Sequence, residues 1–535
     1  MNTHAPLQLW SWLVPFLFFA GWLSLGWWIA PDFGMSYDET FQQEYGRSVL
    51  QYANEHLHFT DHHFSNTPLM ERQNRFHGPV YTTLAAWLNW QLDHTSFRSQ
   101  VLLRHRLSFL FFWLGGLAVF WAGRQLTRRW AWGLVAALLL FLSPRLFGHA
   151  FFNPKDIPNL GLYALAGASL LWVIERPNGW RLAVHAVFSG LALAMRMTGI
   201  FLPLLTLFFL TWRYWSPRAW LTLAWQSAFY LVLGFATTTL CWPTLWDAPL
   251  LRFAEAFRSM SSFPWKGWMW VAGKRVLSTE LPVWYLPVWL GVTIPLMYLW
   301  LGNWGIGRVM VSLWRRMRTR TLKAVSVHSL QVYAAAALFA APLLLIMIRN
   351  PVIYNEWRHL YFIYPFFLVS AAYVAFLLWR QRSQVVPRLV LGLLVANLLF
   401  ITYWQSRWHP NQYVYFNTLA GREQFLRYDM DYWGVSFKQG FEQLAKIDTR
   451  DSIRVIVSDF PGWLNEDYLP GDLKKRIHLS EPGEGVAADY YMTNYHYWHN
   501  WHQGFREHHD YFAYPEVWQL YVGRNPILGI YRMKE

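Results

Sequence analysis

The sequence predicts a polytopic α-helical membrane protein, with about eleven transmembrane helices followed by a small C-terminal α/β domain. Apolar runs of spanning length recur through the first 405 of its 535 residues. Charged residues make up only 14% of the chain, against about 25% in soluble globular proteins. The 36 Trp and 28 Tyr residues also favour a membrane protein, because both rings concentrate where lipid meets water.

The transmembrane helices are expected wherever an apolar run approaches the roughly 20 residues that a bilayer core requires. The first run lacks a small-residue cleavage site, so we expect it to remain as the first helix. The runs occupy residues 9–30, 103–123, 131–149, 158–174, 182–195, 199–212, 219–241, 283–302, 330–348, 359–379 and 389–405.

The distribution of Lys and Arg predicts the orientation in the membrane. With the N-terminus in the cytoplasm, the cytoplasmic connections hold sixteen Lys and Arg residues and one acid, Glu175. The loop 31–100 on the other side holds eight acids and four Lys or Arg. Positive residues collect on the cytoplasmic side, so we expect a multi-pass protein of the plasma (inner) membrane whose C-terminal domain is extracytoplasmic.

Composition also excludes several classes of function. Much of the net charge of +15 belongs to this orientation signal, so we expect membrane lipids and no nucleic acid among the partners. The single cysteine, Cys241, excludes an internal disulfide and a cysteine-based metal cluster. No P-loop or dinucleotide-binding fingerprint is present.

Three segments on the outer side are too long to be simple turns: 31–100, 242–282 and 406–535. In the second, Ala248–Met260 is amphipathic and is expected to lie along the membrane surface. The third combines a helical stretch with β-like runs, which predicts the small soluble domain. These stretches are Phe437–Ile447 for the helix, and Ile453–Ser458, Ala488–Thr493, Val517–Val522 and Ile527–Arg532 for the strands.

Two adjacent carboxylates, Asp38 and Glu39, follow the first expected span. At a membrane edge such a pair is costly unless it has a partner or a function. One carboxylate can accept a proton while the other orients a substrate or a cation. The alternative is a pair of solvated acids that mark the end of the span.

Further polar residues collect at the same outer boundary. Lys155 and Asp156 lie between two spans, where they can form a site or simply neutralise each other. His77 begins an amphipathic stretch and can hydrogen-bond a phosphate or cap a helix. For His56, His58, His62 and His63 with Asp61, a solvated loop is favoured over a zinc site.

Three more basic residues stand at outer ends of apolar segments: Arg196, Arg358 and His359. An arginine at that depth requires an anion, either a protein carboxylate or a lipid-linked phosphate. Glu356 is two residues from Arg358 and is poorly placed on a helix to pair with it.

The order of these patches resembles the GT-C-type glycosyltransferases, in particular the protein O-mannosyltransferase superfamily with its bacterial lipid A aminoarabinose transferases. Gly78, in place of a proline, and the C-terminal domain depart from the family pattern and leave the acceptor open. The patches are Asp38-Glu39, Arg75-Phe76-His77-Gly78-Pro79-Val80, Asn153-Pro154-Lys155-Asp156, Arg358-His359-Leu360-Tyr361 with Tyr364-Pro365, the tail His409–Asn417, and Asp431-Tyr432-Trp433-Gly434.

The resemblance implies a GT-C-like catalytic region over residues 1–405, an extracytoplasmic α/β domain over 406–535, and inverting transfer of a sugar from a polyprenyl-phosphate carrier to a lipid, glycan or protein acceptor. No cofactor is implied with certainty; a divalent cation is possible, with no metal ligands assigned. A ligase or polymerase using a diphosphate carrier, and a flippase or transporter of a lipid-linked sugar, are the alternatives. The implied catalytic residues are Asp38, Glu39 and Asp156, and the donor-phosphate ligands are His77, Lys155, Arg196, Arg358 and His359.

Overall fold

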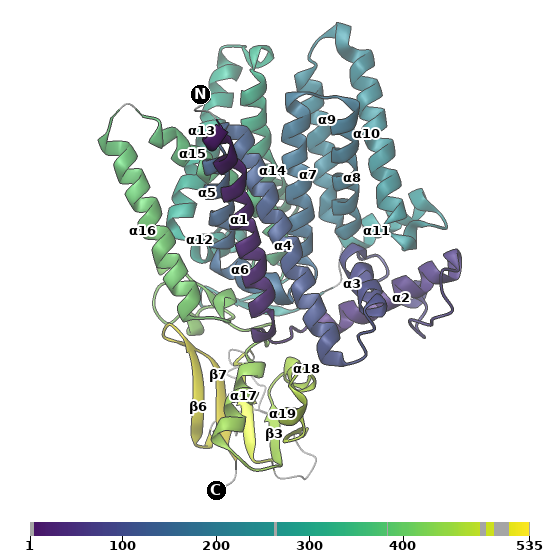
Figure 1. Cartoon of the computed structure of the whole chain (residues 1–535), viewed down its shortest axis with the longest axis vertical. Helices are drawn as coiled ribbons and strands as arrows, with labels where there is room; N and C mark the ends of the chain where they lie inside the picture. The colour runs from purple at the N-terminus through teal and green to yellow at the C-terminus, as the bar shows by residue number, and fades with distance from the viewer. Residues whose placement is uncertain (1–4, 262–264, 382, 482–487, 497–512, 534–535) are drawn as a thin grey trace.

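The protein is a helical bundle with a small sheet-containing domain at one end (Figure 1). The structure, a computed structural model, describes all residues except 1–4, 262–264, 382, 482–487, 497–512 and 534–535. The helices are α1 (Ala5–Ile29), α2 (Glu39–Leu57), α3 (Val80–Gln91), α4 (Phe97–Thr127), α5 (Trp130–Phe141), α6 (Pro144–Phe152), α7 (Asp156–Glu175), α8 (Gly179–Met195), α9 (Phe201–Arg213), α10 (Trp220–Leu240), α11 (Pro249–Ser261), α12 (Tyr285–Thr293), α13 (Leu296–Arg318), α14 (Val327–Arg349), α15 (Tyr364–Trp379), α16 (Val385–Arg407), α17 (Phe437–Ile447), α18 (Pro461–Asp467) and α19 (Gly471–Lys474).

The strands are β1 (Trp268–Val271), β2 (Lys274–Leu277), β3 (Ile453–Val457), β4 (Ile477–Leu479), β5 (Tyr490–Thr493), β6 (Glu516–Val522) and β7 (Asn525–Arg532). Two short 3-10 helices contribute to the site described below: η3 (Met197–Ile200) and η7 (Arg358–Ile363).

Apolar helices make the chain a multi-pass membrane protein. Among the described residues, six helices are long and apolar enough to span a membrane, or seven if the bent pair α5 and α6 forms one span. The six are Trp12–Asp32, Phe97–Thr127, Asp156–Glu175, Val327–Arg349, Arg358–Trp379 and Val385–Arg407.

The expected number of about eleven spans is therefore not confirmed, and prolines explain part of the difference. The expected span 131–149 bends by 69° where α5 gives way to α6 at Ser143-Pro144. The expected span 283–302 breaks at Ile294-Pro295. Proline removes a helix hydrogen bond and disfavours helical geometry in the preceding residue. The run 182–212 forms two apolar helices, each shorter than 18 residues.

The centre of the bundle is α7, which packs against α4, α8 and α14. Its contact with α4 is close enough to require glycine: a Cβ on Gly161 would lie 2.2 Å from the backbone oxygen of Phe111. Small residues allow helix backbones to approach in this way within membranes. The tight packing fixes the start of α7, which carries Lys155 and Asp156.

Several elements gather at the end of the bundle that faces the C-terminal domain, opposite the start of α1 (Figure 1). They include α2 and α3 from the first long loop, the antiparallel hairpin β1–β2, and α11, which confirms the amphipathic helix expected over Ala248–Met260. The loops and short elements at this end can therefore enclose a site.

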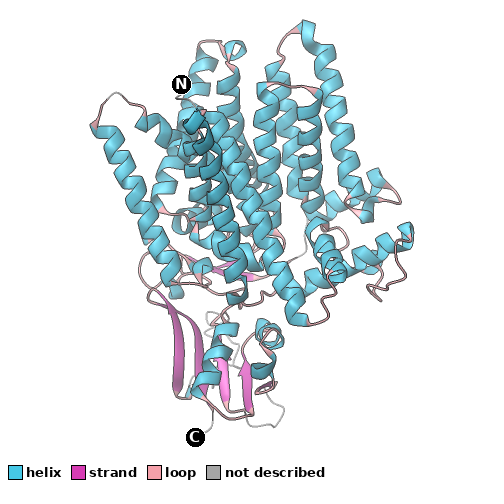
Figure 2. Cartoon of the chain, in the orientation of Figure 1, coloured by secondary structure: helices cyan, strands magenta, loops and turns pink. Residues whose placement is uncertain are grey.

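The C-terminal domain holds a five-stranded mixed sheet of order β4-β3-β5-β7-β6 (Figure 2). Parallel pairs join β3 to β4 and to β5, and antiparallel pairs join β7 to β5 and to β6. Phe437, Phe441 and Leu444 of α17 pack on this sheet. The expected α/β character is confirmed, and α17 has the expected bounds.

One buried side chain, Asn465 of α18, joins this domain to the loop that precedes Asp38. Its Oδ1 accepts a hydrogen bond from the Met35 backbone nitrogen at 2.8 Å. Its Nδ2 lies within 2.9 to 3.1 Å of the backbone oxygens of Met35, Gly434 and Pro461. Asn465 thus sets the position of the loop relative to the domain.

Asn465→Ala is expected to loosen this junction, because it leaves the buried Met35 N–H without an acceptor, at a cost of about 1–3 kcal/mol. Limited proteolysis should cut the loop or the domain faster than in the wild type. The control Asp467→Asn changes an exposed residue of the same helix. Equal cleavage of wild type and Asn465→Ala would show that the junction does not depend on this side chain.

Candidate active site

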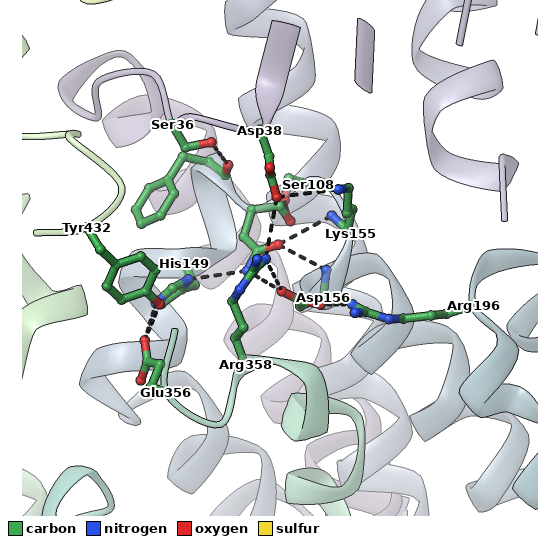
Figure 3. A network of polar contacts seen from close by, with 12 residues as sticks. Ser36, Asp38, Ser108, His149, Lys155, Asp156, Arg196, Glu356, Arg358 and Tyr432 are labelled. Carbon is green, nitrogen blue, oxygen red and sulfur yellow. Dashed lines mark hydrogen bonds and ion pairs between the residues drawn. The ribbon is translucent and has the colours of Figure 1, made fainter. Parts of the chain in front are cut away.

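Five charged side chains meet at the end of the bundle nearest the C-terminal domain (Figure 3). They come from four places in the sequence. Asp38 lies at the start of α2, Lys155 and Asp156 lie at the start of α7, Arg196 lies between α8 and η3, and Arg358 begins η7.

These residues form a continuous set of ion pairs. The Asp38 carboxylate lies 3.4 Å from the Lys155 Nζ and 3.4 Å from the Arg358 Nη1. The same Arg358 nitrogen lies 3.3 Å from the Asp156 Oδ2, and Arg196 contacts the other oxygen of Asp156. The alternative in which Lys155 and Asp156 only neutralise each other does not hold, because each has its own partner elsewhere.

Asn153, which belongs to the quoted loop motif but was not assigned a role, organises the start of α7. Its Nδ2 donates to the Asp156 Oδ2 at 3.0 Å. Its Oδ1 accepts from the backbone nitrogens of Asp156 and Lys155 at 3.0 and 3.3 Å. Asn153 therefore holds the Asp156 carboxylate in a fixed direction and fixes the backbone from which Lys155 extends.

The Arg358 guanidinium is also held by aromatic rings. Its central carbon lies 4.8 Å from the ring centre of Tyr354 and 4.8 Å from that of Trp433. Such contacts stabilise a cation that has lost much of its water. Trp433 belongs to the segment after the last span, so the C-terminal part of the chain helps to build the site.

Charge and burial set the ionisation of the groups around this cluster. Burial alone would raise the pKa of Asp38, but Lys155 and Arg358 outweigh it and hold the pKa below its usual value. Burial, followed by the nearby Arg358, lowers the pKa of Arg196 to about 10. Asp38 is therefore a carboxylate and Arg196 a cation near neutral pH.

His77, which was expected as a donor-phosphate ligand, lines both cavities at the cluster. Burial, followed by the positive charges of Lys155 and Arg196, lowers its pKa to about 3. The imidazole is therefore neutral near pH 7. His77 can offer a phosphate a hydrogen bond, but it cannot supply a positive charge.

Glu39 was expected to hold an acceptor or a cation, and the structure places it elsewhere. Its side chain is 2% exposed and lies against the start of α4. Its carboxylate accepts from the Ser36 backbone nitrogen at 2.9 Å and lies 3.2 Å from the His105 Nε2 and 3.9 Å from the Arg104 Nη2. Because α2 begins here, Asp38 and Glu39 point to different sides of the chain.

Two cavities meet at the charged cluster. The larger, of about 1040 Å³, opens between the first loop, the β1–β2 hairpin and the C-terminal domain. The smaller, of about 260 Å³, lies between α8, η3 and the end of α14, and Arg196 and His359 line it. Residues shared by the two cavities are Gln42, His77, Lys155, Tyr354 and Arg358, while Asp38 lines only the larger one.

The linings of the two cavities differ in chemistry. Apart from the shared residues, the smaller cavity is mostly apolar, with Phe76, Met195, Ile200, Phe201, Met260, Ile346, Ile353 and Leu360 among its residues. The larger cavity is lined by aromatic, amide and charged side chains. The positive residues therefore form a wall between an apolar and a polar space.

A second buried ionic cluster, centred on Glu356, lies beside Arg358 (Figure 3). Glu356 Oε2 lies 2.9 Å from the Arg145 Nη1 and its Oε1 lies 3.4 Å from the His149 Nε2. The Tyr432 hydroxyl donates to the same carboxylate. Burial tends to raise the pKa of Glu356, but Arg145 and His149 lower it overall.

The sequence indicated this cluster only in part. Glu356 was expected to be poorly placed to pair with Arg358, and its carboxylate lies instead against Arg145, one helical turn before His149 on α6. The backbone at Asn355 and Glu356 has positive φ angles of 53° and 62°. Such angles are uncommon for residues other than glycine, so the buried carboxylate holds a strained turn just before Arg358.

In the part of the chain that the structure describes, no group of three or more His, Cys, Asp or Glu residues is arranged to hold a metal ion. The site's polar chemistry consists of carboxylates, amides and cations. It can bind an anion and accept a proton.

Comparison with known proteins finds no matching family model and no matching curated protein. Solved structures do match. ArnT from Cupriavidus metallidurans bound to undecaprenyl phosphate is 14% identical with a TM-score of 0.44, covering 97% of this chain and 98% of that one. The oligosaccharyltransferase of Archaeoglobus fulgidus in the apo form is 11% identical with a TM-score of 0.46, covering 91% and 70%. The archaeal oligosaccharyltransferase AglB from the same organism, in complex with an inhibitory peptide and a dolichol-phosphate, is 11% identical with a TM-score of 0.47, covering 91% and 70%. The chain is thus similar, at low identity, to membrane glycosyltransferases of the GT-C type, and the similarity concerns overall fold alone.

Proposed function

We propose that this protein is an inverting membrane glycosyltransferase that moves a sugar from a polyprenyl-phosphate carrier to an acceptor on the side of its C-terminal domain. The main support for this proposal is that the apolar and the polar cavity share a wall of positive residues, among them Lys155 and Arg358. A lipid carrier with a phosphate at its head needs an apolar space that ends in positive charge. An acceptor from water needs a polar space on the other side of the same wall.

The charges at the cluster support a phosphate ligand. Lys155, Arg196 and Arg358 are three cations, and Asp38 and Asp156 are the two carboxylates paired with them. This leaves a surplus of one positive charge. A phosphodiester such as a polyprenyl-phosphate sugar carries one negative charge, which matches the surplus better than the higher charge of a diphosphate carrier.

Asp38 is placed for proton transfer, because it alone among the five charged residues lines only the polar cavity. The acceptor hydroxyl oxygen attacks the anomeric carbon while Asp38 takes its proton. The bond between that carbon and the phosphate oxygen breaks, and the electrons stay with the phosphate. Lys155, Arg196 and Arg358 stabilise the charge that develops there. Asp156 positions two of these cations.

The direct test is a transfer assay with detergent-purified protein and a panel of radiolabelled polyprenyl-phosphate sugars. Loss of sugar from one of the carriers would support the proposal. If the protein binds the labelled lipids without consuming them and moves them across the liposome membrane, it is a flippase and not a transferase. Consumption of diphosphate-linked glycans alone would replace it with a ligase.

Arg196→Gln is expected to raise the donor KM by about 10- to 100-fold, because one charged hydrogen bond to phosphate is lost. Asp156 keeps Arg358 and Asn153 as partners in this variant. KM and kcat for the radiolabelled donor measure the effect. Arg128→Gln is the matched control, because Arg128 forms an ion pair with Glu175 far from the site. An unchanged donor KM in Arg196→Gln would show that Arg196 does not bind the donor phosphate.

A further inference from the structure

The lining of the larger cavity contains information about the acceptor that the proposed reaction leaves open. Nine of its 25 described lining residues are aromatic, and Met269 is the one aliphatic side chain of substantial size among them. The neighbouring apolar cavity has eight Leu, Ile, Val or Met residues among 21. The two spaces therefore suit different kinds of molecule.

Several of the aromatic lining residues come in two groups from different parts of the chain. Tyr37, Phe41 and Phe460 lie with ring centres 5.5 to 6.4 Å apart, and all three remain half exposed. They join the loop of Asp38 to the C-terminal domain. Trp268 and Trp270 face the cavity from the β1–β2 hairpin. Exposed rings of this kind present flat apolar faces next to water.

Polar groups line the larger cavity as well. Gln42, one helical turn after Asp38, is 4% exposed and lines both cavities. At the domain end, the Asp459 Oδ2 lies 3.0 Å from the His496 Nδ1, and Asp429 accepts from the Trp270 backbone nitrogen at 2.9 Å. The larger cavity therefore offers amide, carboxylate and imidazole groups as well as aromatic rings.

We infer that the acceptor is a saccharide, bound between the Tyr37–Phe41–Phe460 group and the β1–β2 hairpin with one hydroxyl directed at Asp38. This inference rests on the proposed function. A sugar ring has apolar C–H faces that pack on aromatic rings, and hydroxyl edges that both donate and accept hydrogen bonds. The acyl chains of a diacyl lipid would require an aliphatic lining, of which Met269 is the one large side chain among the described residues.

The test uses two cavity variants, Phe460→Ala and Trp268→Ala, with Trp463→Ala as matched control. Phe460 and Trp463 are 42% and 37% exposed and lie three residues apart in the chain, but of the two only Phe460 lines the cavity. Malto-, manno- and chito-oligosaccharides of two to six units, a Ser/Thr-rich peptide and diacylglycerol micelles serve as acceptors. Donor loss to water, measured without acceptor, reports the proposed function separately.

We expect transfer to an oligosaccharide, with its KM raised about tenfold or more in each cavity variant and unchanged in Trp463→Ala. Donor hydrolysis and donor KM should stay at wild-type values in all three. Transfer to the peptide or the micelle in place of every saccharide would overturn the inference and leave the proposed function standing. If no donor is consumed at all, the proposed function fails. Saturation-transfer NMR with the same oligosaccharides then decides the inference, which is lost if wild type and Phe460→Ala bind equally.

Discussion

Asp38→Asn is expected to reduce kcat for sugar transfer by a factor of about 10² to 10⁴, the usual contribution of a positioned general base. The amide cannot take the acceptor proton. Donor binding should persist or tighten, because Lys155 and Arg358 lose a competing negative charge. A fall in kcat with an equal or lower donor KM therefore distinguishes loss of the base from loss of folding.

The low pKa of Asp38 also sets the expected pH dependence. Because the group is ionised in the folded protein above its lowered pKa, kcat/KM should have no acid limb between neutral pH and about pH 5, well above the usual aspartate range. Asp32→Asn is the matched control, because Asp32 is an exposed carboxylate of the same loop, 2.8 Å from His409. Wild-type turnover by Asp38→Asn would remove Asp38 from the mechanism.

Glu356→Gln is expected to lower the free energy of unfolding by about 3–5 kcal/mol, the usual cost of removing one partner from a buried ion pair. The change leaves the buried Arg145 without its carboxylate. It also weakens the turn that places Arg358, so the donor KM should rise. The thermal unfolding midpoint in detergent and the donor KM are the two measurements.

A double variant tests whether the loss of stability in Glu356→Gln comes from the unpaired charge of Arg145. Glu356→Gln with Arg145→Met removes both charges and should unfold at a higher temperature than Glu356→Gln alone, because no unpaired buried charge remains. Its recovery should be partial, since Arg145 also donates to the Tyr415 backbone oxygen. A midpoint equal to or below that of the single variant would show that the charge of Arg145 is not what Glu356 stabilises.

The sequence could predict that polar residues gather at one end of the bundle. The positions of the site residues along the chain explain why this prediction was possible. Asp38, Asp156, Arg196 and Arg358 each stand at the end of an apolar segment, so the membrane itself places them at a similar depth. Their pairing then follows from the packing of α7 against its neighbours. The α17 helix could also be predicted from the sequence, because its apolar residues repeat with helical periodicity.

Other features depend on geometry that local sequence does not contain. Glu39 is next to Asp38, but the first turn of α2 directs it to His105 of α4. Arg145, the arginine that pairs with Glu356, lies more than 200 residues earlier, on α6. The apolar runs did not predict where the expected spans 131–149 and 283–302 break. Hydropathy averaged over a window of residues hardly changes at a single proline such as Pro144 or Pro295.

The contact between Asp156 and Arg196 has a consequence for how the chain enters the membrane. The two residues lie at the open end of the hairpin that α7 and α8 form, so they can pair once this hairpin has been inserted. A charge carried alone into hydrocarbon is costly, whereas a paired one is less so. Arg358, which is synthesised later, then meets Asp156 in an already inserted segment. The order of synthesis thus builds the anion site around a neutral pair, Asp156 with Arg196, and adds the positive charge of Arg358 at the end.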